Sequence, residues 1–128
     1  MDEVLVLVQE QAEALKQLGA KLKEESEYTK LTACLDLLST VGSTATYAQI
    51  GRVLGLFAGS AKLARLLGRK MTSDTAANRP LACALVVSAE SGVPGEGFFA
   101  MAKKLGHSFE DAETFWEQQR DACFGATK

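Results

Sequence analysis

The sequence predicts a mainly α-helical single domain with a small β element, a winged helix-turn-helix-like fold with a long N-terminal helix. Residues 2–25 carry apolar side chains at alternating steps of three and four, as in a long helix. Two short helix patterns flank a glycine turn within residues 46–72, and an apolar run at 81–87 precedes a glycine-rich turn. The order helix, turn, basic helix, strand and turn is typical of a winged helix.

A length of 128 residues predicts one domain, with an arm over 1–25, a winged-helix-like core over 44–98 and C-terminal helices over 97–124. Apolar content of 47% and charged content of 23% are ordinary for a soluble protein. No run of about 18 apolar residues predicts a membrane span, and the acidic start lacks the basic region of a signal peptide. We therefore expect a cytoplasmic protein that does not engage a membrane.

The N-terminal repeat leaves two interpretations open. Either the helix packs its apolar stripe on its own domain, with Leu5 and Ala12 widening the stripe, or the stripe is the seam of a homodimer. Gly19 weakens either helix by roughly 1 kcal/mol relative to alanine. The candidate seam residues are Val4, Val8, Gln11, Leu15, Leu18 and Leu22.

Helix boundaries follow from capping patterns. We expect a second helix over 27–40 and a third that begins at Thr46, where Thr46 and Gln49 form a capping box, and ends at Gly55. Ser60 is the expected N-cap of a basic helix over 61–72. Residues 71–78 are expected to form a loop.

The run at 81–87 alternates in the manner of a strand buried on both faces, and the turn at 91–97 is the expected wing. Because Glu90 and Glu96 would repel phosphate, we interpret this turn as structural. Helices are expected over 97–105 and from Ser108 to about Cys123. In the last one, Phe109, Phe115 and Trp116 are expected to be core residues.

Charge gives the clearest functional clue. Residues 37–73 carry five bases and no acid, although the net charge of the chain is −2. A helix at the recognition position could contact the phosphates of duplex DNA, without sequence specificity and with strong salt dependence. The alternative is a solvated helix face. The candidate nucleic-acid-binding residues are Tyr47, Arg52, Lys62, Arg65, Arg69, Lys70 and Arg79, with Asn78 extending the footprint.

Several motifs within residues 46–98 resemble the DNA-binding domain of the alkylguanine-DNA alkyltransferases and alkyltransferase-like proteins. Residues 46–51 match the family's Thr-Tyr-Gly-x-Ile-Ala helix start, and residues 63–68 loosely match its recognition helix. Arg79-Pro80 precedes a cysteine-containing apolar segment, and residues 95–98 are similar to the family's Gly-Gly-Phe close. The resemblance implies a DNA-binding scaffold, and a phosphate contact from the Tyr47 hydroxyl.

The same resemblance does not extend to the chemistry. The family's histidine after the reactive cysteine is Ala84, and its base-flipping arginine is Leu85. A thiol in an apolar strand has its pKa raised, so Cys83 is interpreted as a core residue and not as an alkyl acceptor. Base flipping is likewise not expected.

A second resemblance covers most of the chain. Short bacterial proteins share the Arg-Pro-Leu-x-x-Ala-Leu-Val-Val run found at 79–87 and the Gly-x-Pro-Gly-x-Gly-Phe-Phe turn found at 92–99. This resemblance implies no particular function.

The residues offer no enzyme constellation. Three separated cysteines and the single His107 predict no disulfide framework, no metal site and no cofactor, and we expect no catalytic residue. Two hypotheses remain. One is a non-catalytic nucleic-acid-binding or regulatory protein that uses the basic helix. The other is a protein-interaction module of accessory, immunity or inhibitor type, which binds a partner protein through the N-terminal helix or an apolar surface.

Overall fold

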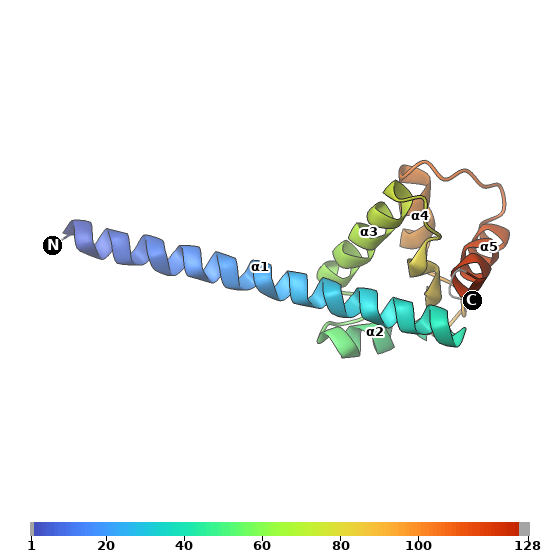
Figure 1. Cartoon of the computed structure of the whole chain (residues 1–128), viewed down its shortest axis with the longest axis horizontal. Helices are drawn as coiled ribbons and strands as arrows, with labels where there is room; N and C mark the ends of the chain where they lie inside the picture. The colour runs from blue at the N-terminus through green and yellow to red at the C-terminus, as the bar shows by residue number, and fades with distance from the viewer. Residues whose placement is uncertain (1, 126–128) are drawn as a thin grey trace.

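The protein is mainly helical, with a two-stranded parallel sheet (Figure 1). The computed structural model describes the backbone of residues 2–125 and the side chains of residues 16–125. Within these residues no helix is both long and apolar enough to cross a membrane. The elements are α1 (Asp2–Val41), β1 (Ala45–Thr46), α2 (Tyr47–Leu54), α3 (Ala61–Ala76), the 3₁₀ helix η1 (Ala82–Leu85), β2 (Val86–Val87), α4 (Glu96–Lys104) and α5 (Ala112–Gly125).

The N-terminal helix is longer than predicted. Residues 2–25 and 27–40 form one 40-residue helix, because neither Ser26 nor its neighbours break the backbone pattern. Its second half packs on the domain, where Leu31 and Leu35 are completely buried. Its first half projects from the domain as an arm (Figure 1).

The predicted caps of α2 and α3 are confirmed. The Thr46 side chain accepts a hydrogen bond from the Gln49 N–H, and the Gln49 side chain accepts one from the Thr46 N–H. Gly55 ends α2 in the left-handed conformation at φ +74°. Ser60 caps α3 by accepting from the Leu63 N–H. These bonds satisfy amides that have no partner inside the helix, which fixes the turn between α2 and α3.

Helix α3 continues through the segment that was predicted to be a loop. It reaches Ala76 because Met71 and Asp74 both turn inward. Asp74 is 1% exposed, and its carboxylate accepts hydrogen bonds from the Arg79 guanidinium and the Ala82 N–H, while the Lys70 ammonium lies 3.2 Å away. This buried carboxylate fixes the last turn of α3 against η1.

The prediction of one continuous strand over 81–87 is wrong, because only Val86 and Val87 form a strand. The segment is a 3₁₀ turn and a two-residue strand, β2, that pairs in parallel with β1 in the register Ala45 to Val86. Ahead of β2, side chains of α5 satisfy the backbone of the segment: the Trp116 indole donates to the Ala84 carbonyl at 2.8 Å, and the Gln119 side chain accepts from the Leu81 N–H at 2.9 Å. Between residues 2 and 125 there is no antiparallel hairpin.

The C-terminal helices close the core with an aromatic cluster. Phe115 and Trp116 are buried as predicted, and the half-buried Phe109 ring stacks on Phe115 with centroids 4.3 Å apart. Helix α5 begins at Ala112, not at Ser108. Asp111 precedes it, and its carboxylate accepts hydrogen bonds from the backbone N–H groups of Glu113 and Thr114 as well as from the Thr114 hydroxyl, so the cap lies three residues later than the sequence pattern indicated.

Candidate functional site

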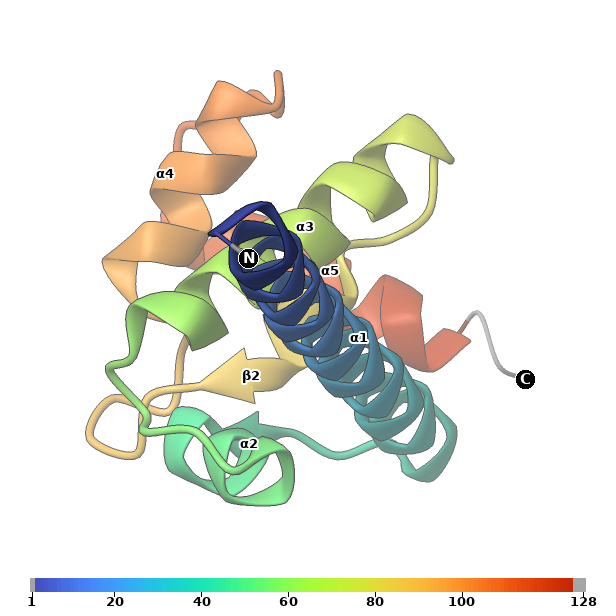
Figure 2. The ribbon, with the colours of Figure 1, turned by 90° about the vertical axis from the view of Figure 1, so that its left-hand side faces the viewer.

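The basic face of α3 lies against an acidic segment of α1. The Lys62 Nζ is 2.6 Å from the Glu27 Oε1, and the Arg65 Nε is 3.1 Å from the Glu24 Oε1. Figure 2, which looks along α1 from its N-terminal end, shows the helix crossing in front of α3. The three carboxylates Glu24, Glu25 and Glu27 are therefore matched one to one with the three cations Lys62, Arg65 and Arg69.

The Arg69 pair has the most specific geometry. Its guanidinium donates to both carboxylate oxygens of Glu25, at 2.9 and 3.2 Å, and its Cζ lies 3.9 Å above the Tyr28 ring. The hydrogen bonds from Arg69 lower the pKa of the Glu25 carboxyl, and the same contact raises the pKa of Arg69. Bidentate pairing and stacking on an aromatic ring fix this side chain more firmly than a single contact does.

The other predicted cations are divided between the core and the surface. Lys70 is 7% exposed and paired with Asp74, so it does not lie on the basic face, and Arg79 contacts both Asp74 and Ser73. Arg52 is exposed on α2, where the described residues place no carboxylate within ion-pair distance. From the predicted set, the structure thus brings Lys62, Arg65 and Arg69 together on one face and pairs each with an acid of α1, whereas Lys70 and Arg79 meet at Asp74.

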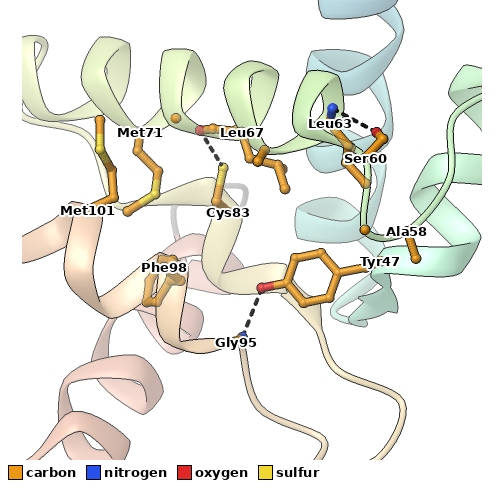
Figure 3. Close-up of a pocket in the computed structure, with 14 residues that line it drawn as sticks. Tyr47, Ala58, Ser60, Leu63, Leu67, Met71, Cys83, Gly95, Phe98 and Met101 are labelled. Carbon is orange, nitrogen blue, oxygen red and sulfur yellow. Dashed lines mark hydrogen bonds between the residues drawn. The ribbon is translucent and has the colours of Figure 1, made fainter.

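Tyr47 faces the protein. Its hydroxyl oxygen accepts a hydrogen bond from the Gly95 N–H at 2.9 Å, and partial burial raises the pKa of the phenol. This hydroxyl lines an open, mainly apolar cavity of about 420 Å³ between α3 and the start of α4 (Figure 3). The lining residues of the cavity on α3, at Cys83 and at the start of α4 are Leu63, Ala64, Leu67, Gly68, Cys83, Gly95, Gly97 and Phe98. Met71 and Met101 also line the cavity, and no sequence pattern had singled out Met101 for a site.

Cys83 is a core residue, as predicted. Its thiol donates to the Leu67 carbonyl at 3.4 Å, and complete burial raises its pKa far above the ordinary range. Burial also raises the pKa of Cys123 to about 11. The imidazole of His107 is hydrogen-bonded to Thr75, away from the cavity, so it does not activate the Cys83 thiol. Among its lining residues, the cavity offers space, an apolar wall and one buried thiol.

Two leucines of the predicted seam are exposed on the arm. Leu18 is 52% exposed and Leu22 is 60% exposed, so the interpretation in which this part of the stripe packs on its own domain is wrong. The other seam residues, Val4, Val8, Gln11 and Leu15, have side chains outside the described part of the chain. Sequence reasoning also missed Phe57, which is 86% exposed in the turn between α2 and α3.

Comparisons with known proteins assign no family. No protein-family model, no curated protein and no solved structure matches the chain. Among residues 16–125, no group of three or more histidine, cysteine or acidic side chains is placed to hold a metal ion.

Proposed function

We propose that this chain is a non-catalytic protein-interaction module, which binds a partner protein through the apolar stripe of the α1 arm. The observation that carries the proposal is the exposure of Leu18 and Leu22 on a helix that projects from the domain. Residues 2–22 of this helix span about 32 Å, a length suited to a helical partner.

The energetics favour a covered stripe. Burying one leucine side chain gains roughly 1.5–3 kcal/mol, so a row of apolar residues along a helix is a strong driving force for association. The domain itself covers neither Leu18 nor Leu22. Apolar side chains gathered in a row on one element mark a binding surface more reliably than scattered ones do.

The state of the basic helix also favours this function over nucleic-acid binding. Each of Lys62, Arg65 and Arg69 has a carboxylate partner on α1, which removes most of the net positive potential from this face. A phosphate backbone that approached α3 would also approach Glu24 and Glu25.

Site-specific photo-crosslinking in living cells tests the proposal. A photoreactive amino acid at position 18 or 22 is expected to form adducts with protein. The matched control is position 37, because Leu37 is equally exposed on α1 but lies outside the arm. Adducts with nucleic acid, or the same yield at position 37 as at positions 18 and 22, would contradict the proposal.

The second candidate function is non-specific binding of duplex DNA by α3. One observation favours it: the Arg65 and Arg69 pairs are largely exposed, and exposed pairs contribute only about 0–1 kcal/mol, so a polyanion could displace the acids. In this case a random duplex binds at about 50 mM salt, and the combination Arg65→Glu plus Arg69→Glu abolishes the binding. Removing the competing acids with Glu24→Gln plus Glu25→Gln would strengthen it. If the duplex binds neither the wild-type chain nor the Glu24→Gln plus Glu25→Gln variant at this salt concentration, DNA binding by α3 is excluded.

A further inference from the structure

We infer that the partner of the α1 arm is a second copy of this chain, bound antiparallel along the apolar stripe. This inference rests on the proposed function, because it names the protein that covers the stripe.

The spacing of the stripe is the first argument. Seam positions continue at steps of three and four to Leu22, and the next step reaches Glu25. Glu25 is bound to Arg69, so the seam ends where α1 begins to contact α3. A repeat with this period suits a helix of the same kind, since two such stripes stay in contact as the helices supercoil.

The residues beside the seam are the second argument. The positions that flank the seam are Leu5, Leu7, Ala12, Ala14, Gly19 and Lys21. Five of these six are apolar or small, and the three in the middle of the arm lack bulky side chains. Small flanking residues let two helix backbones approach closely and extend the apolar contact on both sides of the seam.

The distribution of charge along the arm favours the antiparallel direction. Residues 2–13 carry four acids and no base, whereas residues 14–23 carry three lysines and no acid. In a parallel pair, acidic half would face acidic half and basic half would face basic half. In an antiparallel pair each acidic half lies alongside a basic half. Apart from Lys21 these charges lie outside the seam and its flanks, so they act at longer range, and their attraction favours the antiparallel over the parallel arrangement.

One register satisfies the seam and the charges together. If Val4 lies opposite Leu22 of the second copy, Val8 faces Leu18 and Gln11 faces Leu15. The same register places Glu3 level with Lys23 and Glu10 level with Lys16. Gln11 forms two symmetry-related polar layers at the centre of the apolar seam, each opposite Leu15 of the other copy, and polar seam positions of this type fix register in coiled coils.

Sedimentation of the purified full chain tests the self-association. We expect the wild-type chain to be a dimer at micromolar concentration. The double substitution Leu18→Glu plus Leu22→Glu should raise the dissociation constant of this dimer by at least about 100-fold. Leu37→Glu is the matched control and leaves the dimer unchanged. Because Leu18 and Leu22 do not pack on the domain, the double variant keeps its fold, which circular dichroism verifies. A monomeric wild-type chain overturns the inference, and protein adducts at position 18 would still support the proposed function.

Two further measurements test the direction. In a Cys34→Ser background, Leu22→Cys alone cannot form an intermolecular disulfide in the antiparallel register, because the two positions lie about 27 Å apart. Adding Val4→Cys brings two pairs of thiols together, and a disulfide-linked dimer forms. Raising the salt concentration weakens an antiparallel dimer, since screening removes the attraction between opposite charges. A disulfide-linked Leu22→Cys dimer, or a dimer strengthened by salt, overturns the antiparallel arrangement.

Discussion

Arg69 of α3 joins Glu25 of α1 through two hydrogen bonds, at 2.9 and 3.2 Å, while its guanidinium stacks on Tyr28 one turn of α1 further on. This contact is one of three ion pairs that hold α1 to α3 at the base of the arm. It predicts which substitutions loosen the arm.

Arg69→Lys should destabilise the protein although the charge is kept, because lysine can neither donate in parallel to both Glu25 oxygens nor stack as a plane on Tyr28. A double-mutant cycle of Arg69→Ala and Glu25→Gln, measured by denaturant unfolding, should give a larger coupling energy than the cycle of Arg65→Ala and Glu24→Gln. The Arg65 pair is the control because it has a single contact. Equal coupling in the two cycles would contradict the role assigned to Arg69.

The Glu25 pair also predicts a pH dependence. The hydrogen bonds from Arg69 lower the pKa of Glu25 in the folded state, below the value of about 4.3 for an unfolded glutamate. A depressed carboxyl pKa stabilises the fold at pH values above the unfolded pKa, and this contribution disappears as the pH falls through the folded pKa. The stability difference between wild type and Glu25→Gln should therefore be present at pH 7 and shrink as the pH falls below the unfolded pKa of about 4.3. An unchanged difference at the acidic pH would contradict the assignment.

Thiol reactivity should separate the three cysteines. Burial raises the pKa of Cys83 and that of Cys123, the latter to about 11, whereas Cys34 is only half-buried. A disulfide reagent at pH 8 should label Cys34 in the folded protein and reach the other two only after unfolding. Mass spectrometry of the labelled peptides identifies the site. Rapid labelling of Cys83 would reopen the interpretation of this residue as a nucleophile.

Asp74→Asn should be among the most damaging single substitutions. The change leaves the Lys70 ammonium buried without its counter-ion and weakens the contacts to Arg79 and the Ala82 N–H. Breaking a buried ion pair costs about 3–5 kcal/mol in unfolding free energy. Glu24→Gln, which removes a surface pair, is the control and should cost less than about 1 kcal/mol. Similar losses in the two variants would show that Asp74 does not organise the end of α3.

Two glycines should respond to alanine in opposite directions. A Cβ added at Gly51 would lie 2.5 Å from the Leu56 carbonyl oxygen, so the backbone of the α2–α3 turn must move, at a cost of about 1–3 kcal/mol. A Cβ at Gly19 meets nothing within 4 Å, and Gly19→Ala should stabilise the arm helix by roughly 0.5–1 kcal/mol. Thermal unfolding of the first variant and helical content of the second by circular dichroism measure the two effects.

Local signals in the sequence predicted much of the helical structure. The capping box at Thr46, the glycine stop at Gly55 and the Ser60 cap each depend on residues within one or two turns. The strand at 81–87 was predicted wrongly for the opposite reason. An apolar run indicates burial, but its backbone conformation depends on Trp116 and Gln119, which are more than 30 residues away in the sequence.

The same distinction applies to the site. Sequence located the cations at Lys62, Arg65 and Arg69, and it also showed that residues 37–73 contain no acid. It could not show that the carboxylates of Glu24, Glu25 and Glu27 lie across from them, because those acids are 35 to 44 positions earlier in the chain. The spacing of apolar residues at steps of three and four along the arm was visible in the sequence. The exposure of Leu18 and Leu22 was not, because it depends on where the domain ends.

The continuity of α1 fixes the rotational phase of the arm relative to the domain. Because one uninterrupted helix runs from Asp2 to Val41, each added residue turns everything on its N-terminal side by about 100°. A single alanine inserted after Lys23 would point the Leu18–Leu22 stripe in a different direction, whereas seven inserted residues would restore its orientation to within about 20° and only lengthen the arm. The orientation of a partner bound to the free end of α1 is therefore set by the ion pairs that hold its base to α3.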